Sequence, residues 1–242
     1  MIYFASDTHL GLNYGAFTPR ERELYFVEWL RGIEPTCEVL FLVGDIFDFW
    51  FEYKRVIPKG FTRLFGQLSA MSDRGIVIHF FAGNHDQWVE DYFTKEIGVK
   101  VYTQPTLFEL QGRKVLVAHG DALGKSDFWG VMLGKLFRSG TARWLFQRCL
   151  HPDMALRFGY WWSGHNRLSR GNIGHSFRGQ TEPLVRWAQA EQDGSIDYFV
   201  FGHLHTPTVF ALSHGQVVVL GEWVVNPTYA VMDGGQIELI KI

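Results

Sequence analysis

The sequence is poor in the features that mark exported, cross-linked or membrane-spanning chains. Its 242 residues contain only two cysteines, Cys37 and Cys149, which are too few and too far apart for a disulfide framework or a zinc knuckle. No apolar run approaches the roughly 18 residues that span a bilayer, and no basic segment precedes an apolar one at the N-terminus. These absences predict a protein of a reducing compartment, neither exported nor membrane-spanning, with both cysteines as core thiols.

The chain also lacks low-complexity stretches, internal repeats and linker-like segments. Apolar residues make up 47% of it and charged residues 20%, as in ordinary globular proteins rather than disordered chains. Its length suffices for one substantial core. We therefore predict a single domain over residues 1–242 that carries an elaboration.

The formal net charge of −2 hides an uneven distribution of charge along the chain. Residues 122–179 contain nine lysines and arginines but only two acids, Asp127 and Asp153, so this stretch carries +7 and the remainder −9. A basic, aromatic-rich region suits an anionic partner, either a phosphorylated substrate or an acidic membrane surface. The alternative is a solvated helical face whose arginine stems cover apolar surface.

Five short runs rich in β-branched and aromatic residues predict buried strands. They cover residues 2–5, 39–43, 76–82, 114–118 and 198–201. The intervening patterns predict helices at residues 21–30 and 61–71, and a final meander of antiparallel strands at 209–212, 217–220 and 237–240. The predicted fold class is α/β.

Each of the five runs is followed at once by side chains that can bind metal. The motifs are Asp7-Thr-His9, Gly44-Asp45-Ile-Phe-Asp48, Gly83-Asn84-His85-Asp86, His119-Gly120-Asp121 and Gly202-His203-Leu-His205. Loops at the carboxyl ends of α/β strands converge, so five such motifs predict one site built from five loops. Any single motif has a plainer explanation as a capped turn or a core histidine with a satisfied partner.

Mixed carboxylate and imidazole ligands suit divalent cations such as Mn²⁺ or Fe²⁺. Two such ions normally share a bridging carboxylate, and Asp45 is the natural bridge. A glycine stands beside the key residue in four motifs, at Gly44, Gly83, Gly120 and Gly202, where it permits tight turns and close approach of the backbone to metal or phosphate. We predict two divalent ions, with Mn²⁺ as the first choice.

The stretch from residue 124 to about 178 breaks the rhythm of strands and motifs. Trp129, Met132, Leu133, Leu136 and Phe137 follow the i, i+3, i+4, i+7, i+8 spacing of an amphipathic helix. Further large apolar side chains exceed what a small insertion needs for its own core: Trp144, Leu145, Phe146, Phe158, Trp161 and Trp162. We predict a helical cap over the strand ends.

The order of the five motifs resembles that of the calcineurin-like metallophosphoesterases, which runs Asp-x-His, Gly-Asp-x-x-Asp, Gly-Asn-His-Asp, His-Gly and Gly-His-x-His. The match extends from Asp7 to His205. The resemblance implies a four-layer α/β/β/α sandwich, here with the cap insertion at about 124–178. It also implies two ions, one held by Asp7, His9, Asp45 and His205 and the other by Asp45, Asn84, His119 and His203.

The same resemblance implies hydrolysis of a phosphate ester and assigns roles beyond the ligands. His85 would lie beside the phosphate and stabilise charge or protonate the leaving oxygen. Asp86 would orient His85. For Asp86 and Asp48 the alternative is support of the ligands or capping of a turn. His79 falls within a predicted strand, which favours a core imidazole with a satisfied partner.

A second resemblance concerns the substrate. Three segments are similar to the UDP-2,3-diacylglucosamine diphosphatases of lipid A biosynthesis: Asp45-Ile-Phe-Asp48-Phe-Trp50, His119-Gly-Asp121-Ala-Leu-Gly-Lys-Ser-Asp127 and Leu150-His151-Pro152-Asp153. This resemblance implies cleavage of UDP-2,3-diacylglucosamine to UMP and 2,3-diacylglucosamine 1-phosphate. The acyl chains would lie in the cap, with Asp127, Arg167 and Arg170 as candidate substrate contacts. The enzyme would be cytoplasmic and peripheral on the inner membrane.

Two other functions stay open. A phosphodiesterase acting on nucleotides or another small diester is one, because many members of the second group have Asn-Arg-Asp where this chain has Asn84-His85-Asp86, the general phosphoesterase form. A non-catalytic metal-binding scaffold is the other, but a scaffold would be expected to have lost a ligand or His85. No nucleic-acid partner is expected, since nucleic acid would explain the charge of the cap but not its aromatic bulk.

Overall fold

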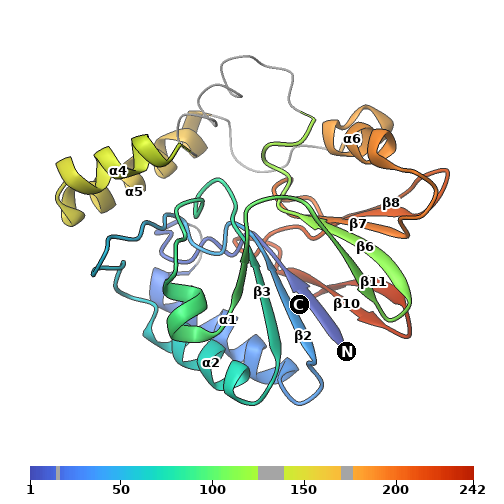
Figure 1. The fold of residues 1–242 in the computed structure, drawn as a ribbon, viewed down its shortest axis with the longest axis horizontal. Coiled ribbons are helices and arrows are strands. Elements are labelled where there is room, and N and C mark those ends of the chain that lie inside the picture. Colours follow the sequence, from blue (N-terminus) through green and yellow to red (C-terminus); the bar gives the residue numbers. More distant parts are fainter. Residues whose placement is uncertain (15–16, 125–138, 170–176) are drawn as a thin grey trace.

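The computed structural model describes residues 1–14, 17–124, 139–169 and 177–242, with all their side chains except those of residues 142, 143 and 162–169. Two β-sheets lie face to face, and helices cover the outer face of each (Figure 1). No helix in the described ranges combines the length and the apolar character needed to cross a bilayer.

The first sheet contains six strands and the second contains five. In spatial order the first is β11 (Gln236–Lys241), β10 (Thr228–Asp233), β1 (Ile2–Ala5), β2 (Val39–Val43), β3 (Val77–Phe81) and β4 (Lys100–Tyr102). The second is β5 (Thr106–Leu110), β6 (Arg113–Ala118), β7 (Tyr198–Phe201), β9 (Gln216–Val219) and β8 (Thr208–Ala211). β1 to β4 are parallel, as are β6, β7 and β9. Within each sheet, the carboxyl ends of these strands therefore lie on one edge.

The central strands are buried on both faces, which explains why they are continuous apolar runs rather than alternating ones. In β1, Ile2 and Phe4 face the second sheet, whereas Tyr3 and Ala5 face the helices. Phe4 stacks on Phe41 of β2 with ring centroids 4.8 Å apart. The predicted four-layer α/β/β/α sandwich is confirmed.

The helices are α1 (Pro19–Ile33), α2 (Thr62–Asp73), α4 (Gly140–Cys149), α5 (Pro152–Ser169) and α6 (Pro183–Glu191), with a π-helical turn η1 (Phe93–Ile97) and a 3₁₀ turn η2 (Gly179–Thr181). Thr18 and Glu21 form a capping box at the start of α1. The first turn of α2 has no cap of its own, and buried Glu23 of α1 accepts the backbone N–H groups of Arg63 and Leu64 at 3.0 and 3.2 Å. Both helices lie where the sequence predicted them.

Only residues 150 and 151 separate helices α4 and α5, and we call this helix pair the cap hairpin (residues 140–169). It packs on the loops that follow β2 and β3: Phe146 lies against Phe51 and Trp88, with ring centroids 4.7 and 4.9 Å apart. The Tyr53 hydroxyl donates to the Leu150 carbonyl at 2.9 Å. The helix expected at residues 129–137 lies outside the described residues, and the single domain and the insertion bounds stay predictions.

Three local expectations have clear outcomes. The final meander is wrong as a single unit, because β8 and β9 belong to the second sheet and β11 pairs with β10 in the first. Cys37 is buried, which raises the pKa of its thiol to about 12, but Cys149 is exposed on α4 rather than in the core. His79 is a core imidazole as predicted, with its Nδ1 3.0 Å from the Tyr102 hydroxyl.

Candidate metal centre

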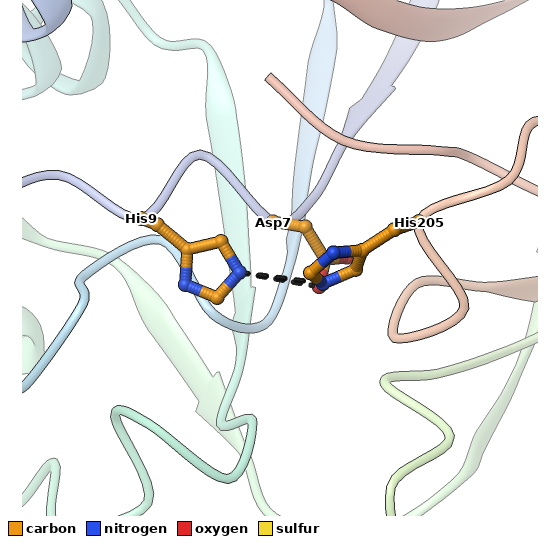
Figure 2. A group of neighbouring side chains, drawn as sticks. All are labelled: Asp7, His9 and His205. Carbon is orange, nitrogen blue, oxygen red and sulfur yellow. Dashed lines mark hydrogen bonds and ion pairs between the residues drawn. The ribbon is translucent and has the colours of Figure 1, made fainter. Parts of the chain in front are cut away.

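Asp7, His9 and His205 meet where the loops after β1 and β7 converge, and we call them the first ligand group (Figure 2). The Oδ1 atom of Asp7 lies 3.0 Å from His205 Nε2 and 3.8 Å from His9 Nε2. The two Nε2 atoms are 3.4 Å apart. Three donor atoms of different side chains thus surround one small space, as the ligands of a single ion would.

Asp45, His119 and His203 form the second ligand group, with donor atoms all within 4.8 Å of one another. The Oδ2 atom of Asp45 lies 3.3 Å from His119 Nε2. Asp45 also groups with His9 and His85 under the same criterion. Asp45 therefore adjoins both ligand groups, as a bridging carboxylate must.

The backbone at these residues is held in a conformation that side chains disfavour. Among the described residues, six that are not glycine have φ in the left-handed region, and one of them is Gln111. The other five are all predicted ligands: Asp7, His9, Asp45, His203 and His205, with φ between 45° and 66°. Each such residue costs on the order of 1–3 kcal/mol. Strain concentrated at these five positions is typical of a functional site.

Two glycines make room for the ligands. A Cβ atom on Gly44, whose φ is +80°, would overlap the ring of His119. A Cβ atom on Gly83 would overlap the carboxylate of Asp45. The glycines of these motifs thus do more than permit turns, because they let ligands from two different strands approach each other.

Backbone contacts fix which atoms face the site. His119 Nδ1 donates to the Val43 carbonyl at 2.9 Å, so its Nε2 points toward Asp45 and is the nitrogen that would bind a metal ion once it has lost its proton. The Asp7 Oδ2 atom accepts the N–H of His203 at 2.9 Å. His119 Nε2 and Asp7 Oδ1 are buried and make no hydrogen bond within the described part of the chain. Buried polar atoms of this kind are costly, and a bound cation would satisfy both, so the residues fit a metal centre.

The electrostatics of the site couple carboxylates to imidazoles. Burial opposes the charge of Asp45, but His119 and His85 outweigh it and hold the pKa of Asp45 well below its usual range. Burial also opposes the charge of His119, yet Asp45 raises the pKa of that imidazole well above its usual value. Asp7 raises the pKa of His205 against burial in the same way. Dications would take the place of these imidazolium charges and release protons on binding.

His85 and Asp86 occupy different positions. The His85 N–H donates to Asp45 Oδ1 at 2.8 Å, and its Nδ1 donates to the Asp48 carbonyl at 2.8 Å. Asp86 is fully buried and accepts four backbone N–H groups instead, from Gly83, Asp45, Ile46 and Phe47. The Asp48 backbone therefore orients His85. The contacts of Asp86 favour the alternative reading, capping of a turn, over the expected role of orienting His85.

For the remaining predicted residues, the structure gives a position but few contacts, or no position at all. Asn84 is exposed on the turn after β3, so its place in the second ligand group stays a prediction. Asp48 is buried, with its Oδ1 3.8 Å from His9 Nδ1. Asp127 and Arg170 lie outside the described residues, and the side chain of Arg167 is also outside them. The proposed substrate contacts therefore stay predictions.

Sequence reasoning missed Tyr160 of α5, the residue through which the cap hairpin contacts the edge of the site. Its ring packs near Phe49, with centroids 6.3 Å apart, and burial followed by the charge of Asp48 raises the pKa of its hydroxyl to about 12. A Cβ on Gly159 would overlap the Phe49 ring, so the helix lies very close there. The small residues Ala155 and Gly159, spaced i, i+4, were the available signal of this inward face.

Known proteins are similar to this chain over most of its length. Residues 1–207 match a family model described as calcineurin-like phosphoesterase. A relative from Porphyromonas gingivalis, named UDP-2,3-diacylglucosamine hydrolase, is 38% identical over 248 residues, which span 96% of this chain and 94% of that protein. A relative of the same name from Stenotrophomonas maltophilia is 26% identical over 244 residues, with the same shares covered. A solved structure of an archaeal phosphodiesterase aligns with a TM-score of 0.48 and 14% identity over 100% of this chain and 99% of that one.

Replacing Gly83 by Ala should weaken metal binding, because the new methyl group would displace the carboxylate of Asp45. We expect a loss of manganese affinity of about tenfold or more, in the range seen when residues that support metal ligands are changed. Manganese bound per chain, measured by elemental analysis after equilibrium dialysis, gives the result.

Gly66→Ala is the matched control, since Gly66 lies in α2 and a Cβ there meets no atom within 4 Å. This variant should bind manganese as the parent does. Its free energy of unfolding should be about 0.5–1 kcal/mol higher than that of the parent, as expected for Gly to Ala within a helix. Equal manganese affinity in the Gly83→Ala variant and the parent would show that Asp45 needs no such space.

Proposed function

Because the chain belongs to the calcineurin-like phosphoesterase family, we propose that it is a two-metal hydrolase of UDP-2,3-diacylglucosamine. The proposed reaction cleaves the pyrophosphate at the α-phosphorus and yields UMP and 2,3-diacylglucosamine 1-phosphate. The main support for a two-metal hydrolase is that Asp45 adjoins both ligand groups. The choice of substrate is supported by similarity, over almost the whole chain, to relatives named for that activity.

The proposed ligands follow the two groups. One ion would be held by Asp7, His9, Asp45 and His205, and the other by Asp45, Asn84, His119 and His203. Their mixture of carboxylate or amide oxygens with imidazole nitrogens supports Mn²⁺ as the metal. When bound, the two ions would neutralise charge on the phosphoryl oxygens and lower the pKa of a water so that hydroxide is available near neutral pH.

His85 is the proposed catalytic residue. Its Nδ1 is engaged with the Asp48 carbonyl, so Nε2 is the atom that would face the substrate phosphate. There it would stabilise negative charge or give a proton to the oxygen that leaves the α-phosphorus. Asp48 and Asp86 would act only by holding the loops that position His85 and Asp45.

Purified protein with Mn²⁺ should cleave UDP-2,3-diacylglucosamine far faster than an aryl phosphodiester of similar charge, because only the first occupies the cap. Rates for both substrates, measured side by side in the same detergent, test this. Equal or reversed rates would remove the lipid assignment and favour the nucleotide phosphodiesterase, to which the Asn84-His85-Asp86 motif also points.

Two variants separate the ligands from the catalytic residue in the same assay. His119→Ala should lose one metal ion and all activity. His85→Ala should keep both ions, while its kcat falls by about 10²–10⁴, the usual effect of losing a general acid. Full activity in the His119→Ala variant would contradict the ligand assignment.

We also propose that the enzyme is peripheral on the cytoplasmic face of the inner membrane. The cap hairpin supports this, because it exposes large apolar side chains: Trp144, Leu145, Met154, Phe158 and Trp161. Trp144 and Trp161 are 56% and 59% exposed. Met154, Phe158 and Trp161 follow i, i+4, i+7 spacing, so they share one exposed face of α5 that differs from the face of buried Ala155 and Gly159.

Basic side chains accompany this apolar surface. Arg148 and Arg157 are exposed on the cap hairpin. The loop that holds the hairpin through Tyr53 continues with exposed Lys54, Arg55, Val56 and Lys59. Anionic lipids attract such residues with about 1 kcal/mol for each Lys or Arg near the surface. Apolar and basic groups together suit an anionic lipid surface better than either does alone.

The double variant Trp144→Ser/Trp161→Ser should bind vesicles containing phosphatidylglycerol about tenfold more weakly than the parent, because two interfacial tryptophans are lost. Cosedimentation with these vesicles, and with neutral phosphatidylcholine vesicles for comparison, provides the measurement. Leu107→Ser/Val209→Ser removes two apolar side chains, 50% and 48% exposed, from β5 and β8 and should bind as the parent does. If both double variants bind like the parent, the cap hairpin is not the docking surface.

A further inference from the structure

A groove of about 240 Å³ opens beside His119, at the carboxyl ends of β3 and β6. One wall is formed by Thr103, Gln104 and Pro105, in the connection between β4 and β5, and the other by residues 118–123, including Asp121 and Leu123. We propose that this groove binds the nucleoside of the substrate, so that the uracil base lies between these walls. This inference rests on the proposed function, and it adds a binding site for one half of the substrate.

The positions of the groove and the cap hairpin divide the substrate between two sides of the metal centre. The cap hairpin meets the centre at the first ligand group, where Tyr160 packs near Phe49 and the adjacent Asp48 lies 3.8 Å from His9. The groove meets the centre at the second ligand group, since His119 itself lines it. A pyrophosphate lying across both groups would direct its lipid half toward one side and its nucleoside half toward the other.

The chemistry of the walls suits a pyrimidine nucleoside better than an acyl chain. The residues that line the groove include Thr103, Gln104 and Asp121, whose side chains carry a hydroxyl, an amide and a carboxylate, along with apolar Pro105 and Leu123. The side-chain amide of Gln104 is exposed and makes no hydrogen bond to any residue that the structure describes. One amide offers both a donor and an acceptor, which match the adjacent N3–H and carbonyl oxygens of uracil.

The size of the groove agrees with this assignment. Its volume lies below the roughly 300–1,000 Å³ of sites that enclose a drug-sized ligand, so it suits a single base and not a diacylated sugar. A carboxylate such as Asp121 can accept hydrogen bonds from ribose hydroxyls, but it would oppose a second phosphate at that end. The groove therefore favours the nucleoside end of a molecule whose phosphate lies at the metal centre.

Direct binding to the Mn²⁺-loaded protein tests the inference without requiring turnover. UMP and ribose 5-phosphate share the phosphate and the sugar, and differ by the base. Isothermal titration calorimetry should give a Kd for UMP at least about tenfold lower than that for ribose 5-phosphate, the effect expected of one stacked and hydrogen-bonded base. Gln104→Ala should reduce this ratio about fivefold or more, because the hydrogen bonds to the base are lost.

Gln189→Ala is the matched control, because Gln189 is exposed on α6 and does not line the groove. It should keep the ratio of the parent. Equal affinities for UMP and ribose 5-phosphate, or an unchanged ratio in Gln104→Ala, would overturn the groove assignment even if the lipid substrate is cleaved. A preference for UMP that depends on Gln104, without cleavage of the lipid substrate, would retain the groove and refute the proposed function instead.

Discussion

The arrangement of the whole site depends on keeping one buried carboxylate, that of Asp45, charged. Its burial is costly for an anion, and the cost is offset by imidazoles from three different loops, at His9, His85 and His119. The backbone N–H of His85 adds a hydrogen bond at 2.8 Å. Metal cations bound by the same imidazoles would also stabilise this carboxylate, so the residues around Asp45 suit a site that is completed by metal.

The parallel strands make this concentration of charge possible. β1, β2 and β3 of one sheet and β6 and β7 of the other end at the same edge, and their apolar runs anchor each loop in the core. The ligands themselves are in left-handed backbone conformations, which would relax if the loops were free. Asp86 ties the loop after β3 to the loop after β2 through the backbone N–H groups of Asp45, Ile46 and Phe47. The rigid sheets and this buried clamp together hold the strain.

Much of the architecture could be predicted from the sequence because the central strands are continuous apolar runs and the ligands follow them directly. Contacts made across the fold were harder to predict. Asp86 accepts backbone N–H groups about forty positions away in the chain, which no local pattern reveals. β4 has only three residues and β5 alternates in burial, so neither gave a strong signal. The meander failed because turn residues predict where strands end but not which sheet each strand joins.

The most direct test of this account is anomalous diffraction at the manganese edge from crystals grown with Mn²⁺. We predict two anomalous peaks per chain, about 3.5–4 Å apart, with Asp45 between them, one peak beside His9 and His205 and the other beside His119 and His203. A single peak, or two peaks that Asp45 does not bridge, would contradict the claim that this carboxylate joins the two halves of the site.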